Sequence, residues 1–127
     1  MRKESQSYRT EYHSARYGLA TALRRHSLSN RALRLLVAML AEADGDGCYS
    51  RHLSYAEDWT GQGTDTTRAA LRELLRSGLV MRHPILPRGY LIDPTCWFSG
   101  STRQLSRRVR QFERARHGLP PEQEPLH

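Results

Sequence analysis

Residues 61–79 carry the side chains most suited to binding chemistry in this 127-residue chain. A glycine lies near each end of this stretch, and the residues between the glycines have helical spacing. Glycine is common where helices begin and end. At about 100° per residue, one side of that helix is apolar and carries Thr67, Ala70, Leu71 and Leu74. The other side is charged and carries Asp65, Arg68, Arg72 and Arg76. The pattern predicts a helix with one face for a core and one for a polyanion; the alternative is a solvated surface helix.

The overall charge also favours an anionic partner. The chain has 20 basic and 13 acidic residues and a formal net charge of +7. Lys3 is the single lysine among the basic residues, and arginine fits phosphates and guanine edges through its planar fork of donors. These features predict nucleic acid as the partner, ahead of an anionic membrane surface.

Membrane insertion and secretion are not expected. The sequence has no apolar run of about 18 residues, the length that a membrane span needs. Its first residues are polar and lack the apolar region of a signal peptide. We therefore expect a cytoplasmic, nucleoid-associated protein in which Cys48 and Cys96 stay as thiols.

The chain divides into four predicted parts. Residues 1–27 form an N-terminal helical extension with a narrow apolar stripe, and residues 28–98 form the main domain. Residues 99–118 form a basic C-terminal helix that ends at a glycine. Residues 119–127 form a tail whose composition predicts disorder.

The main domain begins with a predicted central helix at 30–43. Ser29 is its N-cap, because a hydroxyl can accept from the first N–H groups of a helix. The apolar surface is wide, which predicts burial on more than one side. Its main face is Leu33, Leu36, Val37 and Leu40, and its adjoining face is Ala32, Leu35 and Met39.

Short elements surround the arginine-bearing helix. A strand at 48–50 and a helix at 53–59, capped by Ser54, precede it. Strands at 79–83 and 90–92 follow it and flank a proline-bounded turn. The fold class is therefore mainly α with a small β-hairpin.

This order of elements resembles a winged helix-turn-helix domain with N- and C-terminal helical extensions. Bacterial regulators of this type, MarR-like proteins included, show a similar run: a turn glycine, a helix ending in Leu-x-x-Leu-x-x-x-Gly-Leu, and a strand. Here the glycine is Gly61 and the run spans Leu71 to Leu79. A narrower similarity, to plasmid RepL-type replication initiators, lies in the sequence from Gly89 to Pro94 with Trp97, Phe98 and Gly100.

The resemblance implies a DNA-binding surface. The helix that begins at Thr64 would enter the major groove by its N-terminal end. The residues closest to base edges would be Gln62, Thr64, Asp65, Thr66 and Arg68. Arg72 and Arg76 would contact backbone phosphates, and the wing would lie on the adjacent backbone through Arg82, His83 and Arg88.

A palindromic site would require a homodimer, and terminal helices could supply its interface. The candidate dimerisation residues are Tyr8, Tyr12, Leu19, Leu105, Val109 and Phe112. Two alternatives stay open: both helices fold back on their own domain, or the arginines of the C-terminal helix form a second nucleic-acid contact.

No catalytic or metal-binding pattern emerges from the sequence. Cys48, His52, His83 and Cys96 do not show the spacing of a zinc site. Phosphate-binding glycine loops and catalytic triads are absent from the sequence as well. We therefore expect a protein that is not an enzyme and needs no cofactor.

Three functions follow from these expectations. The first is sequence-specific binding of double-stranded DNA by a bacterial, plasmid or phage transcriptional regulator. A second is a plasmid replication initiator or accessory origin-binding protein. A third, of another class, is a protein-interaction module on a winged-helix fold.

Overall fold

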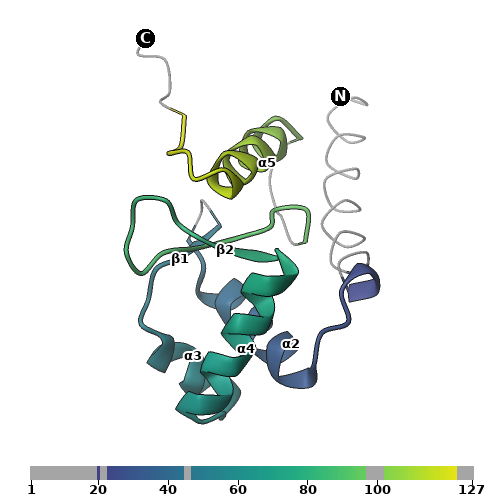
Figure 1. Cartoon of the computed structure of the whole chain (residues 1–127), viewed down its shortest axis with the longest axis vertical. Coiled ribbons are helices and arrows are strands. Elements are labelled where there is room, and N and C mark those ends of the chain that lie inside the picture. The colour runs from purple at the N-terminus through teal and green to yellow at the C-terminus, as the bar shows by residue number, and fades with distance from the viewer. Residues whose placement is uncertain (1–19, 21–22, 45–46, 97–101, 123–127) are drawn as a thin grey trace, which may run out of the picture.

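The computed structural model describes residues 20, 23–44, 47–96 and 102–122. Its helices are α2 (Asn30–Glu42), α3 (Leu53–Thr60), α4 (Thr64–Ser77) and α5 (Thr102–Arg116), and its strands are β1 (Cys48–Tyr49), β2 (Val80–Arg82) and β3 (Tyr90–Ile92) (Figure 1). The predicted class, mainly helical with a small β-hairpin, is confirmed at this level. Among the described helices, none combines the length and the apolar composition needed to cross a bilayer.

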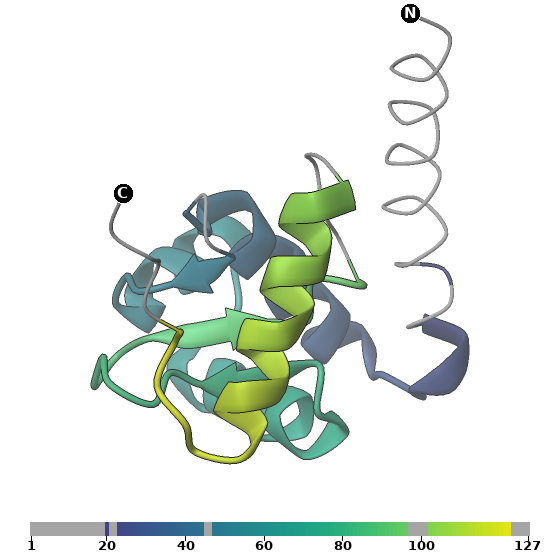
Figure 2. The ribbon, with the colours of Figure 1, turned by 90° about the horizontal axis from the view of Figure 1, so that it is seen from above.

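The three strands form one antiparallel sheet in the order β1-β3-β2. β2 and β3 are the predicted hairpin, with Val80 paired to Ile92. β1 pairs with the outer side of β3, where Cys48 lies opposite Leu91. Helices α2, α3 and α4 lie on one side of this sheet, and α5 lies across the other side (Figures 1 and 2). The sheet therefore separates the predicted binding helix from the basic C-terminal helix.

Helix α2 begins as predicted but buries a different face. The Ser29 hydroxyl accepts from the Ala32 N–H at 3.3 Å, so Ser29 is the N-cap. The buried residues are Ala32, Leu35, Leu36, Ala38 and Met39. Val37, predicted to lie on the main face, is 55% exposed. Because α2 is apolar on nearly every side, its periodicity could not fix its rotation, and packing against α4 and the sheet selects the face around Leu35 and Met39.

Helix α3 begins with a different cap from the predicted one. The His52 Nδ1 accepts from the Ser54 N–H at 3.2 Å, so His52 is the N-cap and Ser54 lies inside the first turn. Ala56 is the buried residue of this helix, whereas Tyr55 and Trp59 are 48% and 62% exposed. The Trp59 indole N–H donates to the Glu42 carboxylate at 2.9 Å, which holds the ring against the end of α2.

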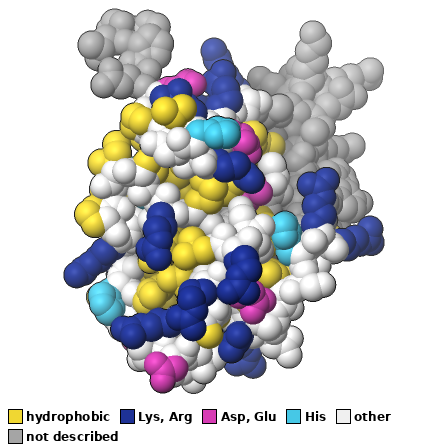
Figure 3. Space-filling view, viewed as in Figure 1, with side chains coloured by type: hydrophobic (Ala, Val, Ile, Leu, Met, Phe, Trp, Pro, Cys, Tyr) yellow, Lys and Arg dark blue, Asp and Glu magenta, His cyan; other side chains and the backbone are white. Residues whose placement is uncertain are grey.

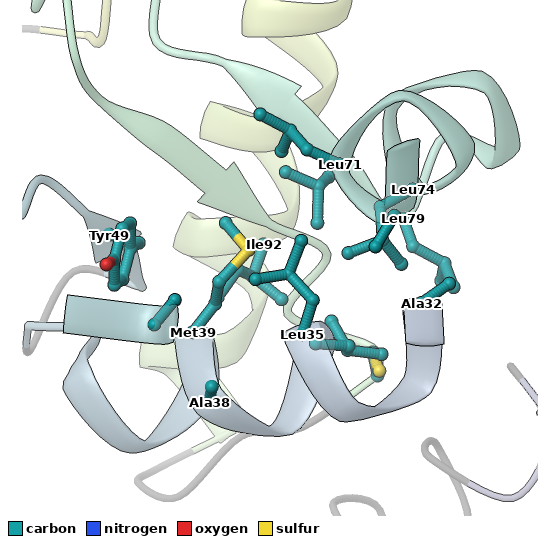
Figure 4. Close-up of a cluster of buried hydrophobic side chains, with 14 residues drawn as sticks. Ala32, Leu35, Ala38, Met39, Tyr49, Leu71, Leu74, Leu79 and Ile92 are labelled. Carbon is teal, nitrogen blue, oxygen red and sulfur yellow. The ribbon is translucent and has the colours of Figure 1, made fainter. Parts of the chain in front are cut away.

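Helix α4 confirms the predicted division into two faces. Thr67, Ala70, Leu71 and Leu74 are buried, as the spacing indicated. Figure 4 shows Leu35 and Met39 of α2 directed toward this side of α4, with Leu79 and Ile92 completing the core. Truncation of a buried leucine such as Leu74 to alanine would cost about 2–5 kcal/mol of stability. Burial therefore fixes which side of α4 points outward.

Glu73 joins the middle of α4 to the start of α2. Its carboxylate accepts from both the Ser29 N–H and the Ser29 hydroxyl at 2.7 Å. These two hydrogen bonds hold the pKa of Glu73 below its ordinary value; partial desolvation opposes them, and the charge of Arg31 adds to them. A negative charge at the N-terminus of a helix also complements the helix dipole.

Thr67→Val is expected to raise the free energy of unfolding by about 1 kcal/mol. The Thr67 hydroxyl is buried without a hydrogen-bond partner among the described residues, and valine has the same shape without the polar group. Urea denaturation measures the change. Thr66→Val, at an exposed position of the same helix, should change stability by less than about 0.5 kcal/mol. A loss of stability in Thr67→Val would contradict the assignment of an unpartnered hydroxyl.

The Glu73 hydrogen bonds predict a dependence of stability on pH. Because the pKa of Glu73 is lowered on folding from its ordinary value of 4.5, its contribution is present above pH 4.5 and is lost as the pH falls through the lowered value. Urea denaturation of the wild type and Glu73→Gln should therefore show a stability gap that narrows on acidification. Glu113→Gln, at an exposed position of α5 where the carboxylate lies 3.4 Å from the Arg116 Nε, controls for the loss of one negative charge. A difference in stability between the two proteins that stays constant with pH would contradict a stabilising role for the charged Glu73 carboxylate.

Candidate nucleic-acid interface

The connection between α3 and α4 exposes the N-terminal end of α4. Gly61 adopts a left-handed conformation, with φ of 70°, and its N–H donates to the Glu57 carbonyl at 2.8 Å. Gly63, the N-cap of α4, provides no side-chain hydrogen bond to the helix. Thr64, Asp65 and Thr66 are exposed in the first turn. Helix N-termini carry unpaired N–H groups and a positive dipole end, so this turn is suited to an anionic ligand.

The predicted charged face of α4 is exposed along its length. Arg68, Arg72 and Arg76 follow one another every four residues, and all three are exposed. Within the described ranges, Arg68 and Arg72 make no ion pair, whereas Arg76 lies close enough to Glu73 to stabilise its carboxylate. Figure 3 shows Lys and Arg side chains spread over the side of the molecule that carries α4. The exposed arginines therefore keep hydrogen-bond donors for a ligand.

Gln62 differs from the other predicted base-contacting residues. Its residue surface is only partly exposed, and its side-chain Oε1 is buried without a hydrogen-bond partner among the described residues. The backbone N–H of Gln62 donates to the Thr60 hydroxyl at 3.2 Å. A base contact by Gln62 stays a prediction, and it would require the side chain to turn outward from the connection.

The turn between β2 and β3, residues 83–89, is the predicted wing, and its own side chains hold it together. Arg82 donates to the Tyr90 hydroxyl at 3.2 Å and stacks 5.6 Å from the centre of that ring. The His83 Nδ1 accepts from the N–H groups of Ile85 and Leu86, each at 3.0 Å. His83, expected from the sequence to face a phosphate backbone, therefore uses this nitrogen to form the turn. Arg88 is exposed at the end of the turn.

Gly89 explains why the wing turns so tightly. A Cβ at this position would lie 2.8 Å from the His83 Cβ and 3.0 Å from the Leu86 Cβ, closer than side chains pack. The Gly89 carbonyl accepts from the His83 N–H at 2.7 Å and closes the loop. This close approach fixes where Arg88 leaves the wing.

A surface cleft of about 200 Å³ joins the wing to both helices of the predicted motif. Its lining residues are Arg51, His52, Leu53, Glu57, Thr64, Arg68, Pro87, Arg88 and Tyr90. Thr64, Arg68 and Arg88 are predicted site residues, and the structure brings them to one place. Arg51 is a lining residue that the sequence analysis does not predict. The available signal was a basic residue just before the first helix of the motif.

Arg51 is held in place by two neighbours. Its Nε lies 3.0 Å from a Glu42 carboxylate oxygen, and its guanidinium lies 5.1 Å from the centre of the Tyr55 ring. The same Glu42 accepts from Trp59. Arginine has five donors, so the contact through Nε leaves the terminal nitrogens for another acceptor.

The predicted dimerisation residues divide into two groups. Phe112 is 4% exposed in the single chain and packs beneath the Arg116 guanidinium, so little of its surface is left for a partner. Leu105 and Val109 are partly exposed. Tyr8, Tyr12 and Leu19 lie outside the described residues, as does 123–127 of the predicted tail. Dimerisation therefore stays a prediction, with Phe112 as its weakest member.

The two cysteines are buried thiols. Desolvation, followed by the nearby charge of Asp93, raises the pKa of the Cys96 thiol to about 11. A thiol with this pKa stays protonated near neutral pH and is a poor nucleophile or metal ligand. Across the described ranges, no three His, Cys, Asp or Glu residues gather in a way that could hold a metal ion.

Comparison of the chain with protein-family models, curated proteins and solved structures gives no match.

His83→Ala is expected to lower the free energy of unfolding by about 1 kcal/mol, because two N–H groups of the turn lose their acceptor. His83→Asn should retain most of the stability, since the asparagine oxygen can occupy the position of Nδ1. Urea denaturation gives the stability, and amide exchange at Ile85 and Leu86 reports on the turn. An equal loss in both variants would show that Nδ1 does not hold the wing.

Proposed function

We propose that this chain is a sequence-specific double-stranded DNA-binding protein of the winged helix-turn-helix class, acting as a bacterial, plasmid or phage transcriptional regulator. The observation that carries the proposal is the arrangement of α4. One face of this helix is buried, its arginine face is exposed, and its uncapped N-terminal end lies beside a basic wing.

The topology supports the class. A helix, a short strand and two helices joined by a three-residue connection precede a hairpin, and the first strand pairs with the last. In winged helix-turn-helix domains the second helix of the pair enters the major groove and the hairpin forms the wing. In this chain, α4 and the β2–β3 hairpin are the elements that would take these two roles.

The exposed residues divide by their place on α4. Thr64, Asp65 and Thr66 lie in the first turn, which would reach furthest into a groove; there Asp65 and Thr66 would face base edges. Arg72 and Arg76 lie about two and three turns further along and would contact backbone phosphates. Phosphate contacts position a protein on DNA, and base contacts provide the sequence preference.

Selection of bound fragments from random double-stranded DNA tests the proposal. We expect the fragments to share a common motif. An inverted repeat would indicate a dimeric regulator, and direct repeats would indicate an origin-binding protein. The failure of any motif to emerge would contradict sequence-specific binding.

Salt dependence tests the role of the arginine face. For the wild type, log K for DNA should fall linearly with log salt concentration, as expected when bound phosphates release counterions. Arg72→Ala should weaken binding to selected and to random duplexes alike. It should also reduce the slope of log K against log salt concentration by about 0.9. Arg24→Ala is the charge-matched control, because Arg24 is an exposed arginine that precedes α2. This variant should leave the affinity and the slope unchanged. A flat salt response would instead favour the protein-interaction module.

A further inference from the structure

The cleft between α3, α4 and the wing collects positive charge from three separate segments. Arg51 precedes α3, Arg68 belongs to α4, and Arg88 ends the wing. Among the lining residues, Glu57 is the single carboxylate, and Glu42, which lies outside the lining, pairs with Arg51. Like charges repel when they are brought together, so a cleft with this lining is best stabilised by an anion.

The sheet register explains how two of these arginines meet. Tyr49 of β1 lies opposite Tyr90 of β3 in an antiparallel pair. Arg51 follows Tyr49 by two residues and Arg88 precedes Tyr90 by two, so the pair brings both arginines to the same end of the two strands. The pairing of β1 with β3 therefore links the start of α3 to the end of the wing, and α4 contributes Arg68 from the facing side.

The cleft also holds features that suit an oxyanion. Thr64, the first residue of α4, lines the cleft. Its hydroxyl can donate a hydrogen bond beside the positive end of the helix dipole. Arg51 is already held by Glu42 and by the Tyr55 ring, so little side-chain freedom is lost when it binds. Guanidinium groups form paired, charge-assisted hydrogen bonds with phosphate oxygens.

We propose that this cleft binds one phosphate group of the DNA backbone through Arg51, Arg68 and Arg88. The inference rests on the proposed function and sharpens it. Arg68, expected from the sequence to read a base edge, becomes a phosphate ligand, and Arg51 joins the interface. A phosphate held jointly by the wing and by α4 fixes how far the first turn of α4 enters the groove.

Binding of inorganic phosphate to the full chain tests the cleft without DNA. Sodium phosphate is titrated against sodium chloride at equal ionic strength, and the arginine side-chain Nε–H resonances are followed by NMR. We expect saturable shifts at Arg51, Arg68 and Arg88, with affinity about tenfold lower in Arg88→Ala. Arg24→Ala should bind as the wild type does. Equal, non-saturating shifts at all arginines would overturn the proposal.

DNA binding tests the source of the phosphate. Each single variant should weaken binding to selected and to random duplexes by the same factor, about tenfold; the variants are Arg51→Ala, Arg68→Ala and Arg88→Ala. The double variant Arg51→Ala/Arg88→Ala should weaken binding by less than the product of the single effects, because the two residues share one ligand. If Arg68→Ala weakens the selected duplex more than the random one, Arg68 reads a base and the proposal is wrong.

The two experiments separate failure of the inference from failure of the proposed function. If DNA binding depends steeply on salt but phosphate gives no specific response, the phosphate site in the cleft is overturned and the proposed DNA-binding function is retained. Saturable phosphate binding without any DNA binding overturns the DNA backbone as the source, and a free phosphorylated molecule would then be the ligand. Circular dichroism and the thermal midpoint of each variant establish that it folds.

Discussion

The packing of α2 against α4 is the constraint on which the rest of the structure depends. The buried side of α4 meets Leu35 and Met39 of α2, and Glu73 binds Ser29 at the start of α2. With one side fixed by burial and hydrogen bonding, the arginine side has no position except the surface. A helix that turned about its own axis would expose leucines and bury arginines, at a cost of several kcal/mol. The outward orientation of the arginine face of α4 is therefore a consequence of the core.

Two further links place the wing beside this helix. Strand β1 pairs with β3, which brings the segment before α3 next to the end of the wing. The His83 ring and the close approach at Gly89 then shape the turn from within. Side chains from distant parts of the sequence meet in the cleft because of these backbone contacts, and α5 lies across the opposite side of the sheet, away from the first turn of α4 (Figures 1 and 2).

Features with a local cause could be predicted from the sequence. The two faces of α4 follow from helical spacing, the Ser29 cap from a hydroxyl before an apolar run, and the hairpin from strands around a proline-bounded turn. Features set by packing could not. The spacing predicts Val37 on the buried side, which is wrong because α2 is apolar nearly all round and its rotation is set by packing. The residue type predicts Ser54 as a cap, but His52 caps α3. Arg51 was missed because its partners meet only in the fold.

Hydrogen–deuterium exchange of the full chain, with and without a selected DNA duplex, tests the central claim most directly. If the outward side of α4 is the DNA-binding surface, amide exchange should slow at residues 61–68 and at 83–89 of the wing. Exchange in α5 should stay the same. Protection confined to α5 or to the outer surface of α2 and α3, with none at the start of α4, would contradict the account.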